Sequence, residues 1–181
     1  LRVSEGGTIT VNGLFDAGEA TMSSTGYGAR WGGLMLGTST AATIQLSGTQ
    51  LIEAAPALTV SGLGSVVADS VFMARSASDP LLIVESGSAA ELVVRNSHLQ
   101  NGSRCAHVYP STGRITFANV SFADCEEQAI WAQQAPLDLE ALTLDEGSAH
   151  GLELTGVSGT VAGVDAMNFN GEGAIVALDP H

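Results

Sequence analysis

Apolar residues recur in pairs along this chain, with one residue between the two members of each pair. This i, i+2 spacing puts both side chains of a pair on one face of a β-strand. Helical spacing is not sustained anywhere for three turns, so the pattern predicts short strands. The first members of successive pairs lie 24, 24, 24, 24, 22 and 23 residues apart, and the pairs are Leu34/Leu36, Leu58/Val60, Leu82/Val84, Ala106/Val108, Ile130/Ala132, Leu152/Leu154 and Ile175/Ala177.

Two further apolar series follow the same interval, so that each period holds three short strands. The second series consists of Ile9/Val11, Ile44/Leu46, Val66/Ala68, Leu92/Val94, Ile115/Phe117, Leu139/Ala141 and Val161/Gly163, and the third of Leu51, Phe72, Leu99, Phe122, Leu144 and Phe169. A lone rung cannot bury its inward face, whereas stacked rungs bury a continuous core. We therefore predict an all-β fold, a single-stranded right-handed parallel β-helix (solenoid) of about seven to eight rungs of about 23 residues, because left-handed solenoids with six-residue faces need only roughly 18 per rung.

The repeat extends over the whole chain. We expect one β-helix domain over residues 1–181, which is a segment of a longer protein or of an assembly. Residues 17–30 interrupt the period and are rich in glycine and serine. We interpret them as an insertion loop after the first rung. Leu1 and Val3 have the form of a first-series strand.

The residue between the two inward side chains of each first-series strand must point outward. In a parallel stack these residues form a column with a spacing of about 4.8 Å. The column is apolar for a solvent face, and we predict that Met35, Ile83, His107, Trp131 and Glu153 bind a ligand or a partner. The alternatives for this face are burial under the 17–30 loop, a protein contact and a glycan platform. The complete column is Met35, Thr59, Ile83, His107, Trp131, Glu153 and Val176.

Composition and charge limit the classes of partner that the chain can have. The chain is 45% hydrophobic and 14% charged, which excludes intrinsic disorder. Six arginines and no lysine stand against 19 acidic residues, for a net charge of −13. Such a surface repels phosphate backbones, so we expect no nucleic acid partner. No apolar run approaches the roughly 18 residues of a membrane span.

The chain has two cysteines, Cys105 and Cys125, which both fall just before a first-series strand. Adjacent rungs bring Cα atoms to a distance that a disulfide can span. The alternatives are a disulfide and two buried thiols, and the sequence favours the disulfide, which would agree with export to an oxidising compartment.

Two segments carry a family resemblance: Leu92-Val-Val-Arg-Asn-Ser-His-Leu99 and Ile115-Thr-Phe-Ala-Asn-Val-Ser-Phe122. They resemble rungs of the right-handed parallel β-helix proteins of the pectate-lyase-like superfamily, in which an asparagine, here Asn96 and Asn119, recurs at a tight bend. Thr8–Gly13 and Trp31–Leu34 resemble the start of repeat regions in bacterial secreted or surface proteins. The resemblance implies an extracellular or cell-surface protein, and it implies little about function.

Enzymes of that superfamily cluster carboxylates beside a basic side chain. Here no outward column combines two carboxylates with an arginine, and the pairs that Glu140 forms with Glu153 or Asp138 are the only acidic candidates. The four histidines are scattered, and no calcium-loop motif occurs. We therefore expect no catalytic residue, no metal and no cofactor, and we lean against an enzyme.

Three functions remain open. The first is a non-catalytic structural or adhesive segment, a rod or partner-binding surface that contacts another protein or flanking domains of the same polypeptide. The second is a carbohydrate-binding or polysaccharide-degrading module, with a glycan as partner. The third is a filament subunit that stacks end to end.

Overall fold

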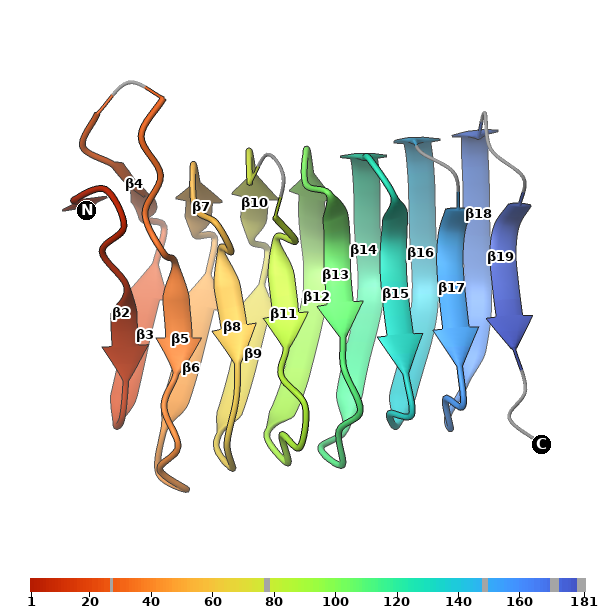
Figure 1. Cartoon of the computed structure of the whole chain (residues 1–181), viewed down its shortest axis with the longest axis horizontal. Helices are drawn as coiled ribbons and strands as arrows, with labels where there is room; N and C mark the ends of the chain where they lie inside the picture. Colours follow the sequence, from red (N-terminus) through yellow and green to blue (C-terminus); the bar gives the residue numbers. More distant parts are fainter. Residues whose placement is uncertain (27, 77–78, 148–149, 170–172, 179–181) are drawn as a thin grey trace.

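A computed structural model gives the fold and describes residues 1–26, 28–76, 79–147, 150–169 and 173–178. These residues form nineteen strands and no helix, and all strand pairs are parallel. The strands stack into a β-solenoid of about seven turns, as predicted. In Figure 1 the strands of the front sheet point down and those behind them point up while the chain advances from left to right. This path is right-handed.

The front sheet has eight strands, one from each successive turn. Its neighbours pair in register, and Leu82, for example, lies between Leu58 and Ala106. The strands are β2 (Ile9–Val11), β5 (Leu34–Leu36), β8 (Leu58–Val60), β11 (Leu82–Val84), β13 (Arg104–Val108), β15 (Gln128–Gln133), β17 (His150–Thr155) and β19 (Gly173–Leu178).

The other sheet forms the remaining two faces of the solenoid. In the early turns each face has its own strand, whereas later strands run through the bend between the two faces. The early strands are β1 (Arg2–Val3), β3 (Leu14–Gly18), β4 (Thr21–Ser24), β6 (Thr43–Ser47), β7 (Gln50–Ile52), β9 (Ser65–Asp69) and β10 (Phe72–Ala74). The long strands are β12 (Glu91–Gln100), β14 (Ile115–Cys125), β16 (Leu137–Gly147) and β18 (Val161–Phe169).

The core consists of the inward side chains of all three faces. The first-series pairs from Leu34/Leu36 to Leu152/Leu154 are buried, as predicted. The side chains of Phe169, Ile175, Val176 and Ala177 lie outside those that the structure describes. Trp31 is fully buried between the first turns, and its indole Nε1 donates a hydrogen bond to the carbonyl of Ile52 (3.0 Å).

The first turn differs from the prediction. Residues 17–30 are not an insertion over the front sheet, since residues 17–24 contribute to β3 and β4, which pair with β6 and β7 on the other two faces. Ile9 pairs with Leu34, so Ile9/Val11 belongs to the first series, and β1 pairs with β4, so Leu1–Val3 belongs to the third face. In Leu14–Gly18 the exposed Leu14 adjoins Phe15, so apolar and polar residues do not alternate cleanly, which hid the strand.

Three inward assignments were also wrong, and one of them is Gly163, which is exposed in the bend with φ = 63°. In the third turn Met73 is buried, while Phe72 points outward and stacks on His98 with ring centroids 5.6 Å apart. In the sixth turn the inward pair is Leu137/Leu139, and Ala141 lies exposed in a bend. Each of these positions stands one or two residues from an apolar residue of the correct register, which the spacing alone does not resolve.

The bend between the second and third faces holds one left-handed residue per turn. Asn119 Nδ2 donates to Asn96 Oδ1 (2.9 Å), and Asn96 Nδ2 donates to Asp69 Oδ1 (2.9 Å), so side-chain amides form a ladder along the bend. A left-handed conformation is costly for residues other than glycine and is best tolerated by asparagine. The left-handed residues of the bend, one per turn and with φ from 43° to 63°, are Glu19, Gly48, Ser70, Asn96, Asn119, Ala141 and Gly163.

Replacing Ala141 by asparagine is expected to stabilise the fold. Ala141 has φ = 51° and follows Asn119 in the ladder, so an amide at this position relieves the left-handed penalty and extends the ladder. We expect the free energy of unfolding in urea to rise by about 1 kcal/mol. Ala162→Asn, at an exposed position outside the bend, is the control; equal effects of both substitutions would contradict the prediction.

Candidate functional site

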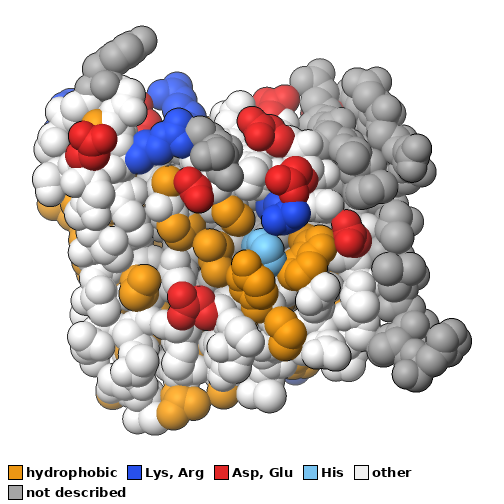
Figure 2. Space-filling model, viewed as in Figure 1, with side chains coloured by type: hydrophobic (Ala, Val, Ile, Leu, Met, Phe, Trp, Pro, Cys, Tyr) orange, Lys and Arg blue, Asp and Glu red, His pale blue; other side chains and the backbone are white. Residues whose placement is uncertain are grey.

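The predicted outward column exists on the front sheet. Met35 is paired with Thr59, Thr59 with Ile83, Ile83 with His107, His107 with Trp131, and Trp131 with Glu153. Figure 2, in which this face points to the viewer, shows hydrophobic side chains gathered around a histidine, with acidic side chains near them. Met35 lies at one end, separated from Ile83 by Thr59, so the cluster centres on His107 and Trp131.

Three aromatic rings form the centre of this face. The imidazole of His107 stacks on Tyr109 with centroids 4.1 Å apart and meets Trp131 edge to face at 4.4 Å. Tyr109 and Trp131 are 6.1 Å apart. Packed rings of this kind stabilise one another beyond the area that they bury. We call His107, Tyr109 and Trp131 the aromatic cluster.

A polar network fixes the aromatic cluster from one side. Glu153 accepts hydrogen bonds from Trp131 Nε1 (3.2 Å) and from Gln128 Nε2 (2.9 Å). Arg104 Nε donates to Gln128 Oε1 (2.6 Å), and its guanidinium forms an ion pair with Glu127. The same guanidinium lies 5.8 Å from the centre of the Trp131 ring, where a cation is attracted to the π face. The rings are therefore held in one arrangement.

A break in strand alternation puts Arg104 and Gln128 on the outer face. In β13 the residues Cys105 and Ala106 are both buried, and in β15 Ala129 and Ile130 are both buried. Each strand thus carries two consecutive inward residues, and the residue before them emerges on the outside. Arg104 pairs with Gln128 across the two strands.

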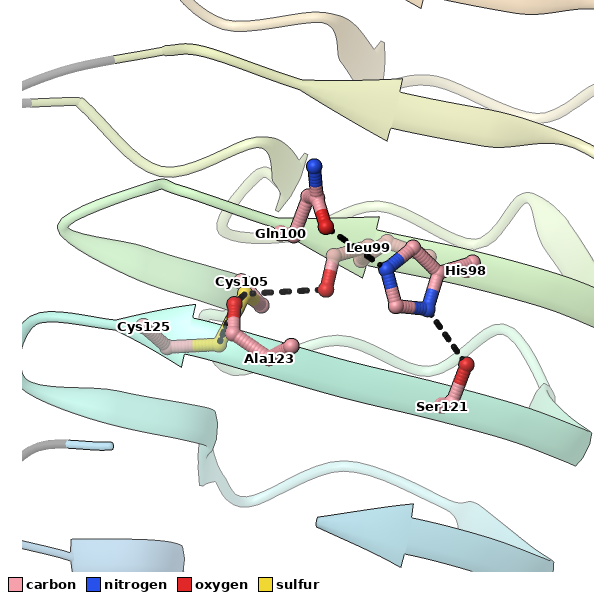
Figure 3. Close-up of a disulfide and its surroundings, with 7 residues drawn as sticks. All are labelled: His98, Leu99, Gln100, Cys105, Ser121, Ala123 and Cys125. Carbon is pink, nitrogen blue, oxygen red and sulfur yellow. Dashed lines mark hydrogen bonds between the residues drawn. A yellow bond between two sulfur atoms is a disulfide. The ribbon is translucent and has the colours of Figure 1, made fainter. Parts of the chain in front are cut away.

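The disulfide lies directly under this part of the sheet. Cys105 and Cys125 are bonded, with Cα atoms 5.6 Å apart, which settles the two alternatives in favour of the disulfide. It closes one turn of the solenoid, from the start of β13 to the end of β14, and both residues are buried. In Figure 3 it lies beside Leu99 and Ala123. The nitrogens of His98, the residue before Leu99, bond Ser121 and Gln100. Cys105 directly precedes Ala106 and follows Arg104, so the disulfide anchors the network.

His107 is held in its neutral form. Burial, with the nearby Arg104 charge as the second cause, lowers the pKa of His107 from 6.5 to about 4. Arg104 Nη1 lies 3.5 Å from His107 Nδ1, and a guanidinium only donates, so Nδ1 accepts and the proton is on Nε2. Nε2 is buried without a hydrogen-bond partner in the described part of the chain.

This histidine makes stability depend on pH. Below pH 6.5 the unfolded chain takes up a proton at His107, whereas the folded chain does so only below about pH 4. The free energy of unfolding should therefore fall as the pH is lowered from 6.5 to 4, by up to about 3 kcal/mol. The lowered pKa values of Asp69 and Asp138, caused first by hydrogen bonds from Asn96 and Thr160, begin to act below about pH 5. Their effect is common to the wild type and to a His107 variant, so it cancels in the difference between the two.

Urea unfolding of the wild type and of His107→Gln between pH 4 and pH 7 measures this dependence. The difference in the free energy of unfolding between the two proteins should change across the window. Parallel curves would show that His107 titrates normally in the folded state.

The sequence missed three residues of the site. Tyr109 lies two residues after His107, so alternation alone could have placed it on the same face. Arg104 and Gln128 had no such signal, because the double inward residues shift them out of alternation. Glu153 was identified, and the structure explains its place as the acceptor for Trp131 and Gln128.

The acidic candidates for catalysis have other contacts. Asp138 accepts from Arg114 Nε (2.8 Å) and from the Thr160 hydroxyl (2.8 Å), so it ties neighbouring turns together. Glu140 is exposed on the second face, whereas Glu153 belongs to the front sheet. Among the residues that the structure describes, no group of three or more histidine, cysteine or acidic side chains could hold a metal ion.

Fold and site define a class: a parallel β-solenoid with an aromatic cluster on one outer face. The chain matches no family model, and no curated protein or solved structure gives a significant match. No comparison thus supports a place in the pectate-lyase-like superfamily, and what the structure shows is the parallel β-solenoid fold. No helix suited to cross a membrane occurs in the described residues.

Proposed function

We propose that the chain is a non-catalytic, partner-binding segment of an exported or cell-surface protein. The observation that carries the proposal is the aromatic cluster, which a rigid sheet and a polar network hold on the outer face. Preformed aromatic groups lose little conformational entropy on binding and dominate the energetics of protein interfaces. The solenoid acts as the rod that presents them.

The proposed location rests on the disulfide and on the surface chemistry. Disulfides persist in oxidising compartments and are rare in the cytosol. The bond between Cys105 and Cys125 lies in the turn that carries His107 and Tyr109, so the proposed binding face depends on it. The resemblance to secreted β-helix proteins points the same way.

A glycan-binding module is the second candidate. An indole and a phenol beside carboxylate and amide groups are also suited to a sugar ring. The arrangement favours a protein partner because the Trp131 ring already contacts His107 and the Arg104 guanidinium, which leaves less of the ring for stacking on a sugar.

The proposal can be tested by displaying the chain as a tetramer on streptavidin. Its binding is then measured to a glycan array and to a displayed random-peptide library. We expect peptide ligands whose binding is lost in Trp131→Ser and kept in Thr116→Ser, a substitution on the second face. Glycan binding that depends on Trp131 would favour the second candidate. Equal binding by both variants, or release of unsaturated or reducing ends from uronic-acid polymers, would overturn the proposal.

A further inference from the structure

A shallow depression of about 500 Å³ lies beside the aromatic cluster, lined by Ile83, Glu85, Ser86 and Tyr109. Ile83 is the neighbour of His107 in the outward column. Tyr109 uses one ring face to stack on His107 and is 39% exposed, so part of its ring faces the solvent. Its backbone N–H bonds the carbonyl of Val84, which places Glu85 next to it. The depression therefore has an aliphatic wall, an aromatic ring and a carboxylate.

One turn further on, an aromatic ring and a carboxylate also lie together, and there a cation occupies the place between them. There the guanidinium of Arg104 lies over the Trp131 ring while Glu127 pairs with it. The depression has the aromatic ring of Tyr109 and the carboxylate of Glu85, and the cation is missing. Glu85 is exposed and forms no ion pair with any residue that the structure describes.

The charge around the depression favours a cation. Glu85 lines the depression, and Glu127, Glu153 and Arg104 lie on the same face of the front sheet around the aromatic cluster. Three carboxylates and one guanidinium leave this face with two negative charges. His107 is neutral near pH 7 and adds no repulsion. Four of the other arginines bond elsewhere: Arg30 to the carbonyl of Ser76, and Arg75, Arg95 and Arg114 to acidic side chains.

We propose that this depression binds an arginine side chain of the partner polypeptide, with the guanidinium between Glu85 and the Tyr109 ring and its methylene groups against Ile83. The planar guanidinium suits both contacts, since it stacks on aromatic rings and pairs with carboxylates, whereas a lysine ammonium is a compact and strongly hydrated charge. The inference rests on the proposed function, because it names the chemistry of the partner at the same face.

Titration of the full chain with a blocked glycine peptide that contains one arginine tests the proposal by NMR. The matched peptide carries citrulline, which is neutral and nearly isosteric. We expect the arginine peptide to shift the amide signals of Ile83, Glu85 and Tyr109, and the citrulline peptide to bind at least about fivefold more weakly, as loss of an exposed ion pair and a cation–π contact implies. A lysine peptide should fall between them.

Two variants test whether the arginine peptide binds at Glu85. Glu85→Gln should weaken the arginine peptide about fivefold. Glu91→Gln, which removes the same charge from an exposed residue of the second face, should leave it unchanged. Equal effects of the two variants, or equal binding of the arginine and citrulline peptides, would overturn the inference. If Trp131→Ser still abolished capture of library peptides in that case, the proposed function would stand with a neutral partner.

Discussion

Replacing Leu82 by aspartate is expected to leave the chain without a cooperatively folded state. Leu82 is fully buried in the middle of the front sheet, between Leu58 and Ala106. An unpaired carboxylate at this position costs several kcal/mol, and the lost packing adds to it, against a total stability of typically 5–15 kcal/mol. Circular dichroism during urea unfolding measures the effect, and Ile130→Asp in β15 should behave in the same way.

Ile83→Asp provides the matched control on the same strand. Ile83 is the next residue along the chain, and its side chain points outward beside His107. Because successive strand residues face opposite sides, the same substitution should here leave the fold intact. A folded Leu82→Asp protein, or an unfolded Ile83→Asp protein, would show that the orientation of β11 is wrong.

Removing the disulfide has the second largest expected effect. Cys105 and Cys125 are 20 residues apart, and closing a loop of this length stabilises a fold by about 3 kcal/mol. The double substitution of both cysteines by alanine should lower the free energy of unfolding by about that amount. Reduction of the wild-type protein should have the same effect, and an unchanged urea midpoint in both experiments would contradict it.

Removing the disulfide should change the site as well as the stability of the fold. Cys105 lies between Arg104 and Ala106 in β13, so loss of the bond loosens the strand start that places the guanidinium near His107. In the double alanine variant we expect the pKa of His107 to move from about 4 toward 6.5, measured by NMR titration. A pKa that stays near 4 would show that the imidazole remains buried without the disulfide, since burial is the first cause of the lowered pKa.

The repeat made most of the fold accessible from sequence. From Leu34 to Leu154 the first-series pairs gave the front sheet, because alternation with a constant period has few structural solutions. The first turn was misread because the apolar Leu14, which is exposed, adjoins Phe15, so that their strand shows no clear alternation. Phe72 was wrongly assigned to the core because it is large and apolar although it lies on the outside. From the sequence, Phe72 and the neighbouring Met73 are equally good candidates for the inward position.

The candidate site was accessible only in part. Alternation places His107 and Trp131 side by side, and their pairing follows from register alone. The polar network could not be found in this way, because two consecutive inward residues at Cys105 and Ala106 displace Arg104 from the pattern. Side-chain contacts such as that between Gln128 and Glu153 depend on rotamers and on neighbouring turns, which one sequence does not encode locally.

The left-handed bend carries a consequence for the order in which the chain folds. Seven turns share one backbone conformation there, yet only some residues, Asn96 and Asn119 among them, favour it by themselves, and Glu19 and Ala141 do not. The conformation at the latter positions must then be imposed by a neighbouring turn that is already formed. Nucleation should accordingly begin in the turns of β12 and β14, and growth should proceed outward from this template in both directions. Substitutions in these two turns should slow folding, whereas those in the first turn should chiefly accelerate unfolding.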